Sequence, residues 1–129
     1  MILGTAKRTK EGEASKPTRY YSKKQEEAVA KAVGGKRTPN SGATDFGGKS
    51  DVDIANLFNI ECKTKTSNSE SISIKKEWIH KNKREALFDG NPYSAIAFNF
   101  GPDGENYYII DEYLFLELVD HLKTLDEPL

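Results

Sequence analysis

Three carboxylates and a lysine lie close together in a short stretch of alternating residues. Asp51 and Asp53 precede a predicted turn near Asn56, and Glu61 and Lys63 follow it. Side chains alternate between the two faces of a strand, and the residues between these four are apolar. If the apolar set points into the core, the charged set shares the opposite face of a β-hairpin.

Carboxylates that converge on one face repel each other unless a cation neutralises them. Carboxylate oxygens, together with a nearby backbone carbonyl, suit Mg²⁺ or Mn²⁺. Lys63 would lie beside such a metal, where its ammonium group could orient a water and stabilise negative charge on a phosphate. The pattern therefore predicts metal-assisted hydrolysis of a phosphodiester. The alternative is an exposed amphipathic hairpin held by cross-strand pairs between Asp and Lys.

Charge is distributed unevenly along the 129 residues, a length that fits one domain. Residues 1–90 carry 18 Lys or Arg against 12 Asp or Glu, whereas residues 91–129 carry one Lys against eight acidic residues. This split favours one surface that attracts a polyanion and another that repels it. The alternative is that both are ordinary solvated faces.

The composition gives information on membrane spans, secretory signals and disulfides. The chain has no run of about 18 apolar residues and no apolar secretory signal at its N-terminus. We therefore expect no membrane association and a cytoplasmic location, or the host cytoplasm if a phage encodes the protein. The single cysteine, Cys62, has no second thiol for a disulfide or a zinc site, so we expect a buried, reduced side chain.

The sequence predicts an α/β domain with an extension at each terminus. Residues 1–19 are predicted to form a flexible basic arm, residues 20–125 a single domain and residues 126–129 a tail. Ser22 and Gln25 form an S-x-x-Q capping box that predicts the start of the first helix, which ends at Gly34 and Gly35.

The remaining elements follow in the order α-β-β-β-α-β-β-α. After the first helix we expect strands over residues 51–55, 58–65 and 71–74, a helix over 75–88, and strands over 93–100 and 106–111. Asp111 is predicted to cap the last helix, whose amphipathic pattern indicates core packing. Its surplus apolar residues, such as Phe115, would also suit a dimer interface.

Several segments together carry a resemblance to a nuclease superfamily. The pattern Asp51-(x)9-Glu61-Cys62-Lys63 resembles the PD-(D/E)XK signature, and "RTPNSG" at residues 37–42 is similar to the R-S-P-G-S-G loop of archaeal-type Holliday junction resolvases. "KKQEEAVAKAVGG" is similar to the first helix of that group. "SISIKKEWIHKNKREAL" is similar to the strand and helix that follow E-C-K in phage-type resolvases. The resemblance covers about residues 22–118.

This resemblance implies a restriction-endonuclease-like core, with a central mixed sheet flanked by helices, and a set of site residues. Asp51, Glu61 and a carboxylate from the first helix would hold Mg²⁺, with Mn²⁺ as a substitute. The backbone carbonyl of Cys62 would complete the metal shell, and Lys63 would be the catalytic lysine. Arg37 and Ser41 resemble loop residues that approach the DNA backbone.

Two of these assignments have competitors. Glu26 is preferred over Glu27 because it flanks the apolar stripe of the first helix. Asp51 is preferred over Asp53 because the superfamily aspartate usually lies where the loop enters the hairpin; either remains possible on sequence alone. Lys65, which shares a face with Lys63, and Lys75, at the start of the second helix, are further candidates for contact with DNA phosphates.

The implied activity is metal-dependent DNA endonuclease cleavage, most specifically of branched DNA such as a Holliday junction. A homodimer is expected, because symmetric nicks in a two-fold junction require two symmetric sites. Two alternatives stay open: another nuclease of the superfamily, such as a repair or restriction-type nickase, and a non-enzymatic DNA-binding protein on the same fold.

Overall fold

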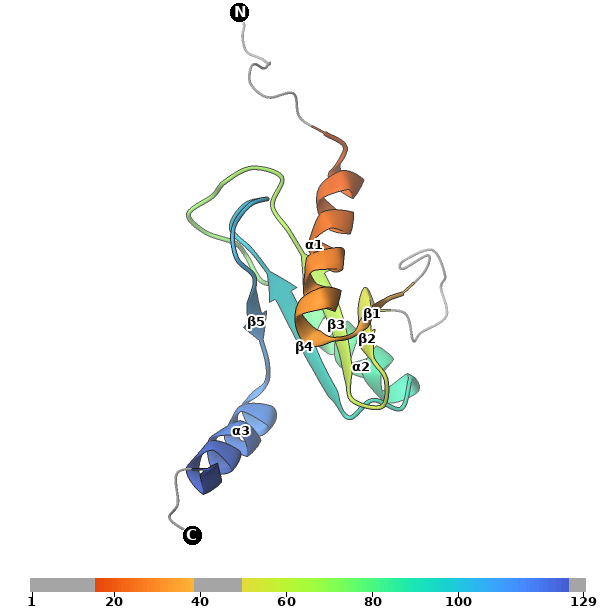
Figure 1. The fold of residues 1–129 in the computed structure, drawn as a ribbon, viewed down its shortest axis with the longest axis vertical. Helices are drawn as coiled ribbons and strands as arrows, with labels where there is room; N and C mark the ends of the chain where they lie inside the picture. Colours follow the sequence, from red (N-terminus) through yellow and green to blue (C-terminus); the bar gives the residue numbers. More distant parts are fainter. Residues whose placement is uncertain (1–15, 39–49, 126–129) are drawn as a thin grey trace, which may run out of the picture.

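The computed structural model describes residues 16–38 and 50–125, which form one five-stranded sheet and three helices (Figure 1). The strands lie in the order β1-β2-β3-β4-β5 across the sheet. The elements are α1 (Thr18–Val33), β1 (Lys36–Arg37), β2 (Val52–Ile54), β3 (Phe58–Lys63), α2 (Lys76–Phe88), β4 (Tyr93–Phe98), β5 (Tyr107–Ile109) and α3 (Glu112–Leu125).

The sheet is mixed, with one parallel pair at its centre. Strands β3 and β4 run parallel and are connected through α2, whereas the other neighbouring strands are antiparallel. A parallel connection needs such a crossover, and a helix supplies it. The predicted α/β class, with a mixed sheet flanked by helices, is confirmed at this level.

The two faces of the sheet are chemically different. On one face, Val29 of α1 packs against Val52, Ile60 and Ala97, all fully or nearly fully buried. On the other face, Asn82 of α2 donates hydrogen bonds from Nδ2 to the backbone oxygen of Ala95 at 3.0 Å and to that of Asn59 at 3.3 Å. The apolar face thus forms the core, and α2 covers a face that contains many polar groups.

Helix α1 begins five residues earlier than predicted. It starts at Thr18, directly after Pro17, and no side chain in the described part of the chain caps its N-terminus. The predicted capping box is wrong, because Ser22 donates to the backbone oxygen of Thr18 and Gln25 is buried against the sheet. The domain boundary placed after residue 19 therefore falls inside α1. The predicted end is confirmed, with Gly34 in the left-handed conformation at φ 70°.

The order of element types is as predicted, but one strand is misplaced. The strand expected at residues 71–74 is wrong: this segment is irregular, and both neighbours of β3 are already in place. The missing strand is β1, in which Arg37 lies opposite Val52 at the sheet edge. The expected hairpin is present, and Asn56 forms its turn at φ 65°.

Helix α3 is capped as predicted but does not pack as predicted. The Asp111 carboxylate accepts a hydrogen bond from the backbone N–H of Leu114 at 3.0 Å, which confirms the cap. The expectation of core packing is wrong, because Leu114 alone among the α3 residues is buried. The helix continues past β5 and away from the sheet (Figure 1). Within the described residues, no helix has the length and apolarity needed to cross a membrane.

Candidate functional site

The centre of the site is the point where β2 ends beside β3. The Asp51 backbone N–H donates to the oxygen of Ile60 at 3.1 Å, which is the last ladder bond of this pair. Beyond it, the Asp51 Oδ2 accepts a hydrogen bond from the backbone N–H of Cys62 at 2.8 Å. The carboxylate thus replaces a strand as the partner of Cys62, and it is nearly buried, at 9% exposure.

Cys62 presents its backbone to the site and its side chain to the core. The N–H and C=O of one strand residue leave on the same side, so the Cys62 carbonyl leaves β3 on the side of Asp51. The thiol packs against the core cluster, and burial raises its pKa well above the ordinary value. The carbonyl is thus directed toward the side of the Asp51 carboxylate, and the sulfur is directed into the core.

Glu61 and Lys63 form the charged pair of β3. The Lys63 Nζ lies 3.5 Å from the Glu61 Oε2, and both side chains are largely buried. Burial, together with the nearby charge of Asp51, raises the pKa of Glu61 to about 7, against the opposing effect of Lys63. Near neutral pH this carboxyl group therefore exchanges a proton readily.

Glu26 is the first-helix carboxylate that points toward the site. Its side chain is 13% exposed, against 57% for Glu27, and its Oε1 lies 3.1 Å from the Arg37 Nη2. Burial and the charge of Asp51 raise the pKa of Glu26, while Arg37 lowers it. The structure thus brings Glu26, rather than Glu27, together with Asp51.

Asp53 belongs to a different polar cluster. Its Oδ1 accepts a hydrogen bond from the Asn91 Nδ2 at 2.9 Å, and Asn91 also contacts Asn59 under α2. Asp51, by contrast, acts electrostatically on both Glu26 and Glu61. The geometry therefore favours Asp51 over Asp53 as the central carboxylate.

The predicted DNA contacts are only partly brought together. Ser41 lies outside the described residues. Arg37 is engaged with Glu26, and β1 holds it beside the site. Lys65 follows directly after β3, where its backbone N–H bonds the Asn99 Oδ1 at 3.2 Å. Lys75 is exposed and immediately precedes α2.

Two residues that support Lys63 were not predicted from the sequence. The Lys63 Nζ lies 4.3 Å from the centroid of the Trp78 ring, a cation–π geometry. The Gln25 Nε2 donates to the backbone oxygen of Lys63 at 2.9 Å. The sequence could have predicted that Gln25 is buried, because it lies four residues before Val29 on the same side of the helix. The capping-box interpretation instead assigned Gln25 to the N-terminus of the helix.

Helix α2 adds a second charged pair beside Glu61. The Lys81 Nζ lies 3.6 Å from the Glu85 Oε2, and Glu85 is 8% exposed, with no hydrogen-bond partner for its Oε1 among the described residues. Lys81 lowers the pKa of Glu61 and Glu85 raises it. Both residues therefore belong to the electrostatic environment of the site.

The donor chemistry of this group fits a divalent cation. In the described part of the chain, no three His, Cys, Asp or Glu side chains are arranged closely enough to hold a metal as they stand. The charge of Asp51 nevertheless raises the pKa of both Glu26 and Glu61, so Asp51 acts on each of the other two carboxylates. A hard cation would relieve this repulsion, and carboxylate and carbonyl oxygens are the ligands that Mg²⁺ prefers.

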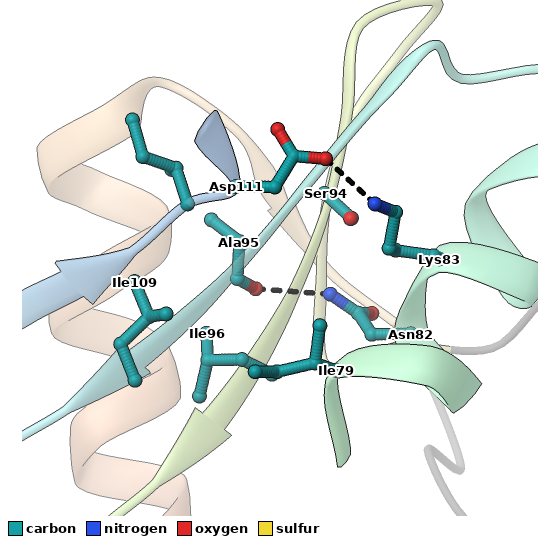
Figure 2. Close-up of a pocket in the computed structure, with 9 residues that line it drawn as sticks. Ile79, Asn82, Lys83, Ser94, Ala95, Ile96, Ile109 and Asp111 are labelled. Atoms are coloured by element: carbon teal, nitrogen blue, oxygen red, sulfur yellow. Dashed lines mark hydrogen bonds and ion pairs between the residues drawn. The ribbon is translucent and has the colours of Figure 1, made fainter. Parts of the chain in front are cut away.

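A separate apolar cavity lies on the other side of α2, between that helix and strands β4 and β5 (Figure 2). Ile79, Ile96 and Ile109 line it, and the ion pair of Lys83 and Asp111 spans one end. None of the predicted site residues that the structure describes lines this cavity. It is therefore distinct from the carboxylate site.

Comparisons with protein-family models, with curated proteins and with solved structures found no match to this chain.

Proposed function

We propose that this protein is a metal-dependent DNA endonuclease built on a PD-(D/E)XK core. The observation that carries the proposal is the convergence of the buried Asp51 carboxylate with Glu26 and Glu61, beside an amine at Lys63. Burying several carboxylates without full neutralisation costs stability. Such an arrangement is typical of sites that hold a cation.

Each residue has a distinct role in this proposal. Asp51, Glu61 and Glu26 would hold Mg²⁺, with the Cys62 carbonyl as a further ligand, and Mn²⁺ would substitute. The metal would supply Lewis-acid stabilisation of the phosphate. Lys63, held between Glu61 and Trp78, orients the attacking water and stabilises negative charge on the scissile phosphate. Arg37, Lys65 and Lys75 supply positive charge for the DNA backbone.

The proposed substrate is branched DNA, with a homodimer making symmetric nicks in a four-way junction. The observations in favour are the sequence resemblance to junction resolvases and the excess of basic residues in residues 1–90. Repair and restriction-type nickases of the same superfamily would share this metal site but act on other substrates. The fold and the site alone do not determine the substrate.

The test is cleavage of a labelled four-way junction and of a linear duplex with matching sequence, in Mg²⁺ and in EDTA. Lys63→Ala is compared with Lys31→Ala, since Lys31 is an exposed lysine in the last turn of α1. We expect paired, metal-dependent nicks confined to the junction, abolished by Lys63→Ala and retained by Lys31→Ala. Binding of the junction in Ca²⁺ should survive both substitutions.

The other outcomes separate the alternatives. Equal cutting of both substrates would keep the nuclease site but contradict junction specificity. Metal-independent cutting, or full activity of Lys63→Ala, would overturn the mechanism. Binding without cutting of either substrate would favour a DNA-binding protein that retains the fold.

A further inference from the structure

Helix α3 presents a continuous apolar surface that the described fold leaves uncovered. Phe115, Leu118, Leu122 and Leu125 are 54%, 45%, 58% and 65% exposed. The first two turns of the helix are held to the body by buried Leu114, by the Lys83–Asp111 ion pair and by a hydrogen bond from the Tyr93 hydroxyl to Glu117 at 2.6 Å, whereas the remainder extends away from the sheet (Figure 1). The apolar side of the helix therefore faces outward.

The spacing of these residues identifies the kind of partner that fits. They follow one another at intervals of three, four and three residues, which is the alternation of the a and d positions in a coiled-coil seam. Leu116 and Tyr113 are also exposed, but they lie outside this line. A stripe with the a and d spacing fits another helix with the same stripe better than a flat sheet or an extended peptide. Helix α3 of a second copy provides that stripe.

The charge of α3 argues against DNA or an anionic membrane as the occupant. Its polar side carries Glu112, Glu117 and Asp120 against Lys123, an excess of negative charge. Amphipathic helices that bind anionic lipid carry mainly basic residues on this side. Phosphates would likewise be repelled, so a protein surface is the matching partner.

The direction of pairing follows from the order of the charges. Glu112 and Lys123 lie eleven residues apart, about three helical turns, and therefore on the same flank of the stripe. If two copies pair antiparallel with Leu118 opposite Leu122, the first turn of each helix, which carries Glu112, lies toward the last turn of the other, which carries Lys123. Antiparallel pairing also places the N-terminus of each helix beside the C-terminus of its neighbour, as the helix dipoles favour.

A groove lies at the base of α3, where the helix joins the body. Leu87, Pro92, Tyr93, Tyr113 and Leu114 line it, next to the cavity of Figure 2 beyond the Lys83–Asp111 pair. In an antiparallel pair with matched layers, Leu118 opposes Leu122 and Phe115 opposes Leu125 of the second copy. The C-terminal end of the second α3 then lies beside this groove.

We infer that α3 is a homodimerisation helix that pairs antiparallel with α3 of a second copy through Phe115, Leu118, Leu122 and Leu125. This surface lies outside the carboxylate site. The inference gives a location to the dimer in the proposed function, but it rests on helix geometry and not on nuclease activity.

The first experiment is sedimentation velocity at micromolar concentration, without DNA or metal. We expect the full chain to sediment as a dimer, and Leu118→Glu and Leu122→Glu each to sediment as a monomer with an unchanged circular dichroism spectrum. Phe88→Glu is the matched control, because Phe88 is 72% exposed on α2 and lies outside the stripe. It should remain a dimer.

The second experiment tests direction by disulfide formation. Oxidation of mixed Leu118→Cys and Leu122→Cys chains should give a cross-linked heterodimer, whereas each chain alone should cross-link poorly. The full chain, whose only thiol is Cys62, controls for background cross-linking.

Three outcomes would overturn the inference: a monomeric full chain, whether or not it binds anionic vesicles; a dimer that survives both glutamate substitutions; or preferential cross-linking of Leu118→Cys with itself. None of these readings depends on cleavage, so failure here leaves the proposed nuclease site untouched, and loss of cleavage leaves this surface untouched.

Discussion

At the residue scale, Glu61 couples the chemistry of the site to the stability of the fold. Its pKa of about 7 in the folded protein exceeds the ordinary 4.5, so the folded state retains a proton that the unfolded chain loses between these values. The free energy of unfolding should therefore fall as pH rises through this window, by about 3 kcal/mol at most.

Glu61→Gln should remove this decline, because the amide does not ionise. We expect the variant to be more stable than the original chain at pH 8 in EDTA and similar to it at pH 4.5, as measured by urea unfolding. Glu77→Gln, at an exposed position on α2, should keep the original pH dependence. If the free energy of unfolding of Glu61→Gln changed with pH in the same way as that of the original chain, the raised pKa assigned to Glu61 would be contradicted.

Trp78 is a positioning residue for Lys63, because its ring lies under the ammonium group. Trp78→Leu removes a cation–π contact of about 0.5–2 kcal/mol and frees the lysine, so we expect cleavage to slow by roughly tenfold. Junction affinity in Ca²⁺ should change little. Trp78→Phe should recover most of the rate, since a phenyl ring keeps a weaker cation–π surface.

The measurement is single-turnover cleavage beside a binding isotherm for each variant. Equal losses of rate in the leucine and phenylalanine variants would indicate that Trp78 acts through packing alone.

At the element scale, Gln25 joins α1 to the two central strands. Its Nε2 donates to the backbone oxygens of Lys63 at 2.9 Å and Ala97 at 3.3 Å, and to the Asn106 Oδ1 at 3.0 Å. One amide thus ties the helix to β3, to β4 and to the segment before β5. The position of Glu26 relative to Asp51 depends on this attachment.

Gln25→Met should lower the free energy of unfolding by about 1–3 kcal/mol, because buried acceptors lose their donor while the side-chain volume is retained. Lys24→Met, at the adjacent exposed position, should have a much smaller effect. Urea unfolding of both variants measures the difference. Equal stability of the two would show that the Gln25 hydrogen bonds contribute nothing net.

At the scale of the whole molecule, the uneven charge distribution should control DNA affinity. Binding through the basic residues releases counterions, so affinity in Ca²⁺ should fall steeply as salt rises from about 50 to 200 mM. Lys75→Ala should reduce the slope of log affinity against log salt by about 1, because one phosphate contact is lost. Lys123→Ala, on the acidic α3, should leave the slope unchanged.

Fluorescence anisotropy with a labelled junction at several salt concentrations measures these slopes. An affinity that does not change with salt would contradict an electrostatic DNA interface. If Lys123→Ala changed the slope more than Lys75→Ala, the interface would lie on the acidic C-terminal part of the chain, contrary to the proposal.

Local patterns predicted the parts of the fold that depend on neighbouring residues. The two-residue alternation around Asp51 and Glu61 predicted the hairpin and its charged face, and Asp111 predicted the cap of α3. Residues 71–74 also alternate, yet they form no strand. A strand needs a free edge as well as a pattern, and the sheet order leaves none beside β3.

By itself, the sequence determined the α/β class, the charged face of the hairpin and the candidate residues Asp51, Glu61 and Lys63, because each follows from side-chain periodicity. Only the tertiary structure decided that β1 pairs with β2, that Gln25 and Trp78 support Lys63, and that the apolar side of α3 faces outward. These features join residues far apart in the chain. Their energies depend on which surfaces meet, and local periodicity carries no information about that choice.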